Sequence, residues 1–192
     1  MKNHLQSKYR RTRKPIKLSQ ARQRGFGMLE IGLALLVVAV AIVWAYEQYK
    51  GSRSDEKAQD EVADVTRFVS KTQEVYSVLP DYTGVTTQVL IGNNVFNARS
   101  VNAARTAVTN RYGGAVTSAP ATLVNANDAV AFTSTGYDRE GCGNIPNKVA
   151  NGLRRIDING AIVKADGANL DPNQVAAACQ ANGNNLIYYV GK

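Results

Sequence analysis

The stretch RGFGMLEIGLALLVVAVAIVWAY, residues 24–46, decides the fold of this 192-residue chain. From Phe26 to Tyr46 it holds 21 residues and a single charge, that of Glu30. As an α-helix with a rise of about 1.5 Å per residue, such a segment is roughly 30 Å long, which matches the hydrocarbon core of a bilayer. The sequence therefore predicts a membrane-spanning helix close to the N-terminus.

Basic residues are concentrated in front of this apolar stretch. Residues 1–25 contain nine of the 23 Lys and Arg and no acid, which leaves 14 basic and 15 acidic residues, a net charge of −1, for the remainder. The positive-inside rule keeps residues 1–25 in the cytoplasm and sends the remainder across the membrane. Trp44, Tyr46 and Tyr49 lie at the far end of the span, where interfacial aromatic side chains are expected. Because the basic character belongs to residues 1–25, the remainder is not expected to bind nucleic acid.

Glu30 is the feature that neither a plain anchor nor a secretory signal peptide explains. A charge in an apolar span costs about 2.5–3.5 kcal/mol near the bilayer centre and less near an end, so such residues are functional candidates. A signal peptide would have a shorter basic region and a cut on the far side, for which Ala39 and Ala41 offer small residues, but this leaves Glu30 without a role. A simpler alternative is that Glu30 favours the helix N-terminus or snorkels to the interface.

The sequence GFGMLE, residues 25–30, follows a basic leader and precedes an unbroken apolar run, and it resembles the processing site of type IV pilins. The resemblance implies that a prepilin peptidase cuts between Gly25 and Phe26 on the cytoplasmic side, and that Phe26 is then N-methylated. The family pattern has a glutamate four residues after the new terminus, and Glu30 is four residues after Phe26. A cut after Gly27 would instead place Glu30 only two residues after Met28. The long leader and the start Phe-Gly-Met-Leu-Glu are similar to the type IVb branch, which includes thin pili of enteric bacteria and conjugative plasmids.

The resemblance implies that the chain is the major structural subunit of a helical filament and not an enzyme. Glu30 of one subunit would neutralise the amino group of Phe26 of its neighbour, since a charge pair in an apolar filament core fixes the axial register. The implied partners are other copies of the chain, the prepilin peptidase, the assembly ATPase with its inner-membrane platform, the inner membrane before assembly, and a host or recipient-cell receptor. The alternatives are a minor pilin or pseudopilin of a related machine, and an uncleaved, single-pass anchored periplasmic binding protein.

Three segments are predicted: a basic cytoplasmic leader (1–25), the apolar half of the N-terminal helix (26–50), and a head outside the cytoplasm (51–192). The helix continues into the head as an amphipathic helix that ends at residue 79, before Pro80. Gly51 is the predicted hinge, and the alternative is two separate helices joined there. The apolar face of the head part consists of Ala58, Val62, Val65, Val69, Thr72, Tyr76 and Leu79.

The rest of the head has the pattern of an α+β fold, and the type IV pilin resemblance implies a long helix packed on an antiparallel sheet. Residues 120–138 predict two strands, and residues 155–164 a hairpin in which Asn159 and Gly160 supply the two positive-φ residues of the turn. Asp171 is the predicted N-cap of a helix in which Gln174 completes a capping box. A final strand follows at the C-terminus.

Three further segments of the head lack a clear pattern. Residues 81–94 are interpreted as a loop with a short strand, residues 97–114 as a short helix that ends at a glycine pair, and residues 138–143 as a solvated, glycine-rich turn. The loops at 81–98 and 114–130 are the predicted surfaces for a receptor or a neighbouring subunit.

Cys142 and Cys179 are the only cysteines, and they are far apart in the sequence. In a chain that crosses a membrane they indicate one structural disulfide on the oxidising side, with two buried free thiols as the alternative. The pilin resemblance favours the disulfide, which would fasten the C-terminal segment to the head. The only histidine is His4, so the head has no histidine for a catalytic triad or a zinc site, and no metal or cofactor is expected.

Overall fold

The structure is a computed structural model that describes residues 27–192; the predicted leader, which ends at Gly25, and the predicted new terminus Phe26 lie outside this range. The described chain forms two compact units that divide after Trp44, and the first helix runs through both. The helices and strands, in chain order, are α1 (Met28–Val75), α2 (Thr87–Gly92), β1 (Val108–Thr109), β2 (Ala115–Ala121), β3 (Ala129–Tyr137), α3 (Arg139–Val149), the 3-10 helix η1 (Ala150–Gly152), β4 (Arg155–Ile158), β5 (Ala161–Lys164), α4 (Pro172–Ala178) and β6 (Asn184–Gly191).

The long helix α1 continues through Gly51 without interruption. The alternative of two separate helices joined at Gly51 is therefore not what the structure has, while a bend at that residue stays a prediction. The predicted end at residue 79 is wrong by four residues. After Val75 the chain enters a turn in which the amide of Leu79 donates to the carbonyl of Tyr76 at 3.2 Å, so Leu79 leaves the apolar face and is 46% exposed.

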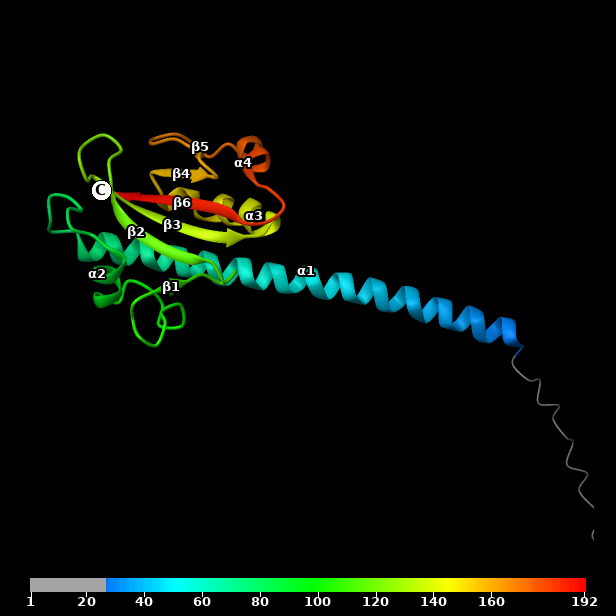
Figure 1. Cartoon of the computed structure of the whole chain (residues 1–192). Coiled ribbons are helices and arrows are strands. Elements are labelled where there is room, and N and C mark those ends of the chain that lie inside the picture. The colour runs from blue at the N-terminus through cyan, green and yellow to red at the C-terminus, as the bar shows by residue number, and fades with distance from the viewer. Residues whose placement is uncertain (1–26) are drawn as a thin grey trace, which may run out of the picture. The chain divides into compact units, whose positions relative to one another are not determined.

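The sheet has six strands in the order β1-β2-β3-β6-β4-β5, and every neighbouring pair is antiparallel. The last strand of the chain, β6, lies in the middle, between β3 and β4 (Figure 1). A C-terminal strand in this position ties the β4–β5 hairpin to the rest of the sheet. The predicted α+β fold with an antiparallel sheet is confirmed.

The core of the head lies between the sheet and the second half of α1, which runs along one face of the strands (Figure 1). The ring of Phe68 stacks on that of Phe132 from β3 with centroids 4.4 Å apart, and it also contacts Tyr188 from β6. Apart from Leu79, the predicted apolar face of α1 is buried or half-buried. The sequence pattern missed two buried residues on this face, Phe68 and Glu61.

Three local predictions are wrong because side-chain caps and turns compete with simple patterns. Residues 87–92 form α2, since the hydroxyl of Thr86 accepts from the amide of Val89 at its start. The predicted helix within 97–114 is absent; the side chain of Asn102 accepts from two backbone amides of a turn, and only strand β1 forms there. Residues 139–149 form α3 rather than a glycine-rich turn, because Asp138 caps it through the amide of Gly141.

The C-terminal predictions are largely confirmed. Asn159 and Gly160 have φ values of 51° and 85° in the turn between β4 and β5. Asp171 caps α4 by accepting from the amides of Asn173 and Gln174. The second half of the predicted capping box is missing, since the amide of Asp171 donates to the carbonyl of Val163 and not to Gln174.

Candidate assembly site

The first half of α1 exposes apolar side chains on every side. The span Glu30–Tyr49 has a mean hydropathy of 1.9 and no part of it is buried within the chain, so by length and composition it can cross a membrane. A helix that is apolar all round needs lipid or other helices as a cover. Its large apolar residues, each more than half exposed, are Ile31, Leu33, Leu35, Leu36, Val37, Val38, Val40, Ile42, Val43 and Trp44.

Glu30 lies in the first turn of α1, where its side chain serves the helix N-terminus. Its Oε2 accepts from the amide of Gly27 at 3.2 Å, the contact that a glutamate makes in a capping box. This agrees with the simpler alternative for Glu30, a preference for the helix start. The second carboxylate oxygen, Oε1, forms no hydrogen bond with any residue between 27 and 192. The carboxylate can therefore cap its own helix and still accept from a further donor, so pairing with Phe26 of a neighbour stays a prediction.

The remaining predicted site residues are Cys142 and Cys179, which the structure brings together as a disulfide. Their Cα atoms are 5.8 Å apart although 37 residues separate them in the sequence. The bond connects α3 with the residue that follows α4, so it fastens the C-terminal region of the head. The alternative of two free thiols is wrong for this structure.

A buried acid that the sequence analysis missed connects α1 to the rest of the head. Glu61 is only 3% exposed; its Oε1 accepts from the hydroxyl of Tyr137 at 2.6 Å and its Oε2 from the amide of Arg111 at 2.9 Å. The Arg111 guanidinium in turn pairs with Asp64, one helix turn further along α1. A signal was available in the sequence, because Glu61 follows the buried Ala58 by three residues and so lies on the same face.

Burial is the main reason why the pKa of Glu61 is raised above its usual value of 4.5, although the two hydrogen bonds work against the shift. A carboxyl with a raised pKa in the folded state binds its proton more tightly there than in the unfolded chain. The contribution of Glu61 to the free energy of unfolding is therefore greatest below about pH 4.5 and falls as the pH rises through the raised value, by at most about 1.4 kcal/mol per pH unit for one proton.

We expect Glu61→Gln to remove this decline, because glutamine does not ionise. Urea unfolding of the full chain in detergent between pH 4.5 and pH 8 would measure it, with the exposed Glu56→Gln as the matched control that keeps the decline. An unchanged decline in Glu61→Gln would show that Glu61 does not cause it.

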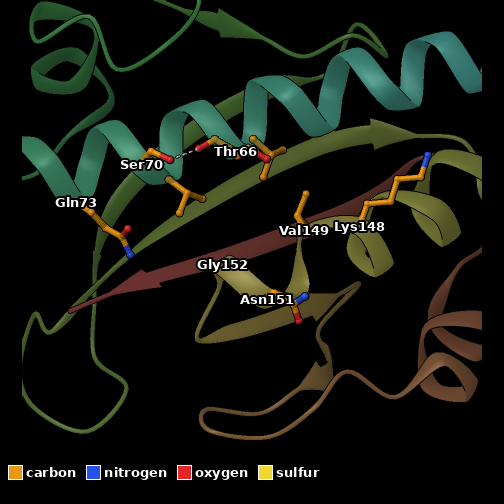
Figure 2. A pocket seen from close by; sticks show the side chains of 9 residues that line it. Thr66, Ser70, Gln73, Lys148, Val149, Asn151 and Gly152 are labelled. Atoms are coloured by element: carbon orange, nitrogen blue, oxygen red, sulfur yellow. Dashed lines mark hydrogen bonds between the residues drawn. The ribbon is translucent and has the colours of Figure 1, made fainter.

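A groove of about 470 Å³ lies in the head between α1 and the end of α3 with η1 (Figure 2). The hydroxyls of Thr66 and Ser70 are bonded to carbonyls of their own helix, and Lys148 is the one charged lining residue. Within residues 27–192 no group of three His, Cys, Asp or Glu side chains is placed to hold a metal ion. The lining of the groove consists of Val65, Thr66, Val69, Ser70, Gln73, Lys148, Val149, Asn151 and Gly152.

An apolar N-terminal helix that continues into a head, where it packs on an antiparallel sheet with a disulfide near the C-terminus, defines a type IV pilin. The chain belongs to the PilS family, because the family model described as PilS N terminal matches residues 55–192. Proteins of this family are structural subunits. The resemblance of residues 25–30 to a type IV pilin is thereby confirmed for the family, although this match does not include those residues.

Solved structures of type IV pilins are similar to the chain, and two of them are compared with it. The type IVb pilin from Salmonella typhi superposes with a TM-score of 0.56 at 20% sequence identity, over 70% of this chain and 99% of that one. TcpA, a type IV pilin from Vibrio cholerae El Tor, gives a TM-score of 0.53 at 14% identity, over 70% and 98% of the two chains. Likeness at this level of identity establishes the fold, which is that of a type IVb pilin. No curated protein matches the chain by sequence.

Proposed function

We propose that the chain is the precursor of the major subunit of a type IVb pilus. Residues 1–25 are a leader that prepilin peptidase removes after Gly25, residues 26–50 anchor the subunit in the inner membrane, and residues 51–192 are a periplasmic head. The pilus ATPase and its membrane platform then move the subunit into a filament whose core is built from the apolar halves of many copies of α1. Adhesion, aggregation or conjugation are the uses that such filaments serve.

The single observation that carries the proposal is the apolar surface of α1 between Ile31 and Trp44, exposed on all sides. In this proposal the apolar surface of α1 is in contact with lipid before assembly and with neighbouring helices in the filament. A helix without a polar side suits both environments. Identical subunits related by a rotation and a shift make contacts that do not close on themselves, so a filament follows from one type of subunit.

We expect the mature chain to begin at Phe26 and to be heavier by one methyl group than the unmodified peptide. Intact mass and N-terminal sequencing of the chain from cells that express the peptidase would measure this. A start at Met28 would still show cleavage by the peptidase, but Glu30 would then lie two residues after the terminus instead of the four that the proposed pairing requires. An intact Met1 terminus in the presence of active peptidase would favour the anchored binding protein. A correctly processed chain that is scarce in isolated filaments would indicate a minor pilin or pseudopilin.

A further inference from the structure

The head contains a hollow lined by two arginines that have no acidic partner. Arg67 projects from α1 and Arg105 from the loop before β1, and both line a hollow of about 380 Å³. Within residues 27–192 neither arginine forms a salt bridge, unlike Arg111, Arg154 and Arg155. The other lining residues are Ile91, Asn94, Phe96, Ala98, Val101, Asn102 and Ala103.

The polar side chains of this arginine hollow offer donors. Nη2 of Arg105 donates to the carbonyl of Ile91 at 3.0 Å and to Oδ1 of Asn94 at 3.2 Å, which holds the guanidinium in place. The same contact occupies the amide oxygen of Asn94, and that of Asn102 accepts from the amides of Thr106 and Ala107. The side-chain groups left are donors of the two arginines and of Asn94. Such a site fits a carboxylate, which a guanidinium binds through two parallel hydrogen bonds.

Two exposed acids lie on the same side of α1 as Arg67. Glu56 and Asp60 precede Arg67 by eleven and seven residues, and at about 100° per residue all three point within about 20° of one direction. This stripe lies opposite the buried face that contains Val65, so it points away from the sheet. Asp60 has a distant partner in Arg111, at 3.8 Å, and its side chain is 56% exposed. The stripe therefore carries acids at one end and a cation at the other.

Because the stripe is acidic at one end and cationic at the other, the acidic end of one copy can pair with the cationic end of a second, parallel copy. When several α1 helices bundle with their sheets outward, the stripes face one another across the bundle. At a rise of about 1.5 Å per residue, an axial offset of about 10–16 Å places Glu56 and Asp60 of one copy beside Arg67 of the next. No offset leaves acid against acid and cation against cation, which charge repulsion disfavours.

We propose that the arginine hollow of Arg67 and Arg105 receives the carboxylates of Glu56 and Asp60 from a second copy of the chain in the filament. The contact is heterologous, so it repeats along the filament, and it sets the axial offset of the heads. It rests on the proposed filament function. It differs from the pairing of Glu30 with Phe26 because it acts in the head and involves no processed terminus.

Charge reversal in the full chain tests the proposal in cells. Arg67→Glu should reduce isolated filaments by about tenfold or more, since the repulsion recurs at each subunit, and Arg67→Glu combined with Asp60→Lys should restore them. Lys148→Glu reverses a charge elsewhere on the head and should leave filaments unchanged. Membrane insertion, processing and the melting temperature of each variant are measured alongside. If wild-type chains are unprocessed or form no filaments, the proposed function itself is wrong. If wild-type chains form filaments and the Arg67→Glu variant forms them equally well, the proposed function stands and only the proposed contact at the arginine hollow is wrong.

Cysteine cross-linking gives a second readout that does not depend on filament yield. The only cysteines of the chain form the Cys142–Cys179 disulfide, so introduced cysteines would be its only free thiols. Asp60→Cys and Arg67→Cys in one chain are about 10 Å apart along α1, beyond the reach of a disulfide, so a bond between them has to join two copies. Mild oxidation of intact filaments should yield a ladder of cross-linked chains. Gln59→Cys with Thr66→Cys has the same spacing about 100° around the helix and should yield monomers. Monomers from the first pair, or equal ladders from both, would overturn the proposal.

Discussion

Glu30→Ala is expected to abolish filaments while the chain is still inserted, processed and folded. The head has its own core, which begins at Ala58, so removal of a carboxylate from the first turn of α1 leaves that core intact. The loss of the hydrogen bond to Gly27 costs about 1 kcal/mol of helix stability. In an assembled filament, by contrast, the amino group of Phe26 would remain as an unpaired cation in an apolar core, which costs several kcal/mol per subunit.

Electron microscopy of sheared filaments and a protease-resistance assay of the head would measure the two outcomes separately. Glu30→Gln keeps the size of the side chain without its charge and should behave as Glu30→Ala does. Glu47→Ala removes the acid at the other end of the apolar stretch and is the matched control that should assemble. Normal filaments from Glu30→Gln would show that the carboxylate serves only the start of its own helix.

The second large effect is expected from removal of the disulfide. Cys142 is fully buried and Cys179 is 7% exposed, and the bond closes a loop of about 38 residues. We expect Cys142→Ala combined with Cys179→Ala to lower the free energy of unfolding by about 3–4 kcal/mol, a large part of the 5–15 kcal/mol that is usual for a domain. Within the head, we expect α4 to be destabilised most, because Val175 is its one buried residue.

Urea unfolding of the full chain in detergent, with and without a thiol reductant, would test this effect. Reductant should destabilise the wild-type chain to about the level of the double variant and should leave the double variant unchanged. Hydrogen exchange at α4 should become faster in the variant than exchange at β3 and β6. A double variant as stable as the wild type would mean that packing of the C-terminal segment, and not the bond, holds it to α3.

The amino-acid sequence determined the features of this protein that depend on neighbours along the chain. The segment from Phe26 to Tyr46, with 21 residues and the single charge of Glu30, predicts a helix that is long and apolar enough to span a membrane. Residues 25–30 carry the resemblance to pilins in six positions. The turn at Asn159 and Gly160 and the cap at Asp171 are also local, since each is decided by the backbone preferences of two or three residues. The helix predicted around Asn102 is nevertheless absent, because the side chain of Asn102 accepts hydrogen bonds from backbone amides in a turn.

The tertiary structure alone decided the features that join distant parts of the chain. The central position of β6, the choice of a disulfide over two free thiols, and the burial of Glu61 under Tyr137 each depend on contacts separated by dozens of residues. The same is true of the arginine hollow, because Arg67 and Arg105 come from a helix and a loop without a shared pattern. Periodicity identifies which face of a helix is buried, but the partner of that face is set by loop closure and packing over the whole head.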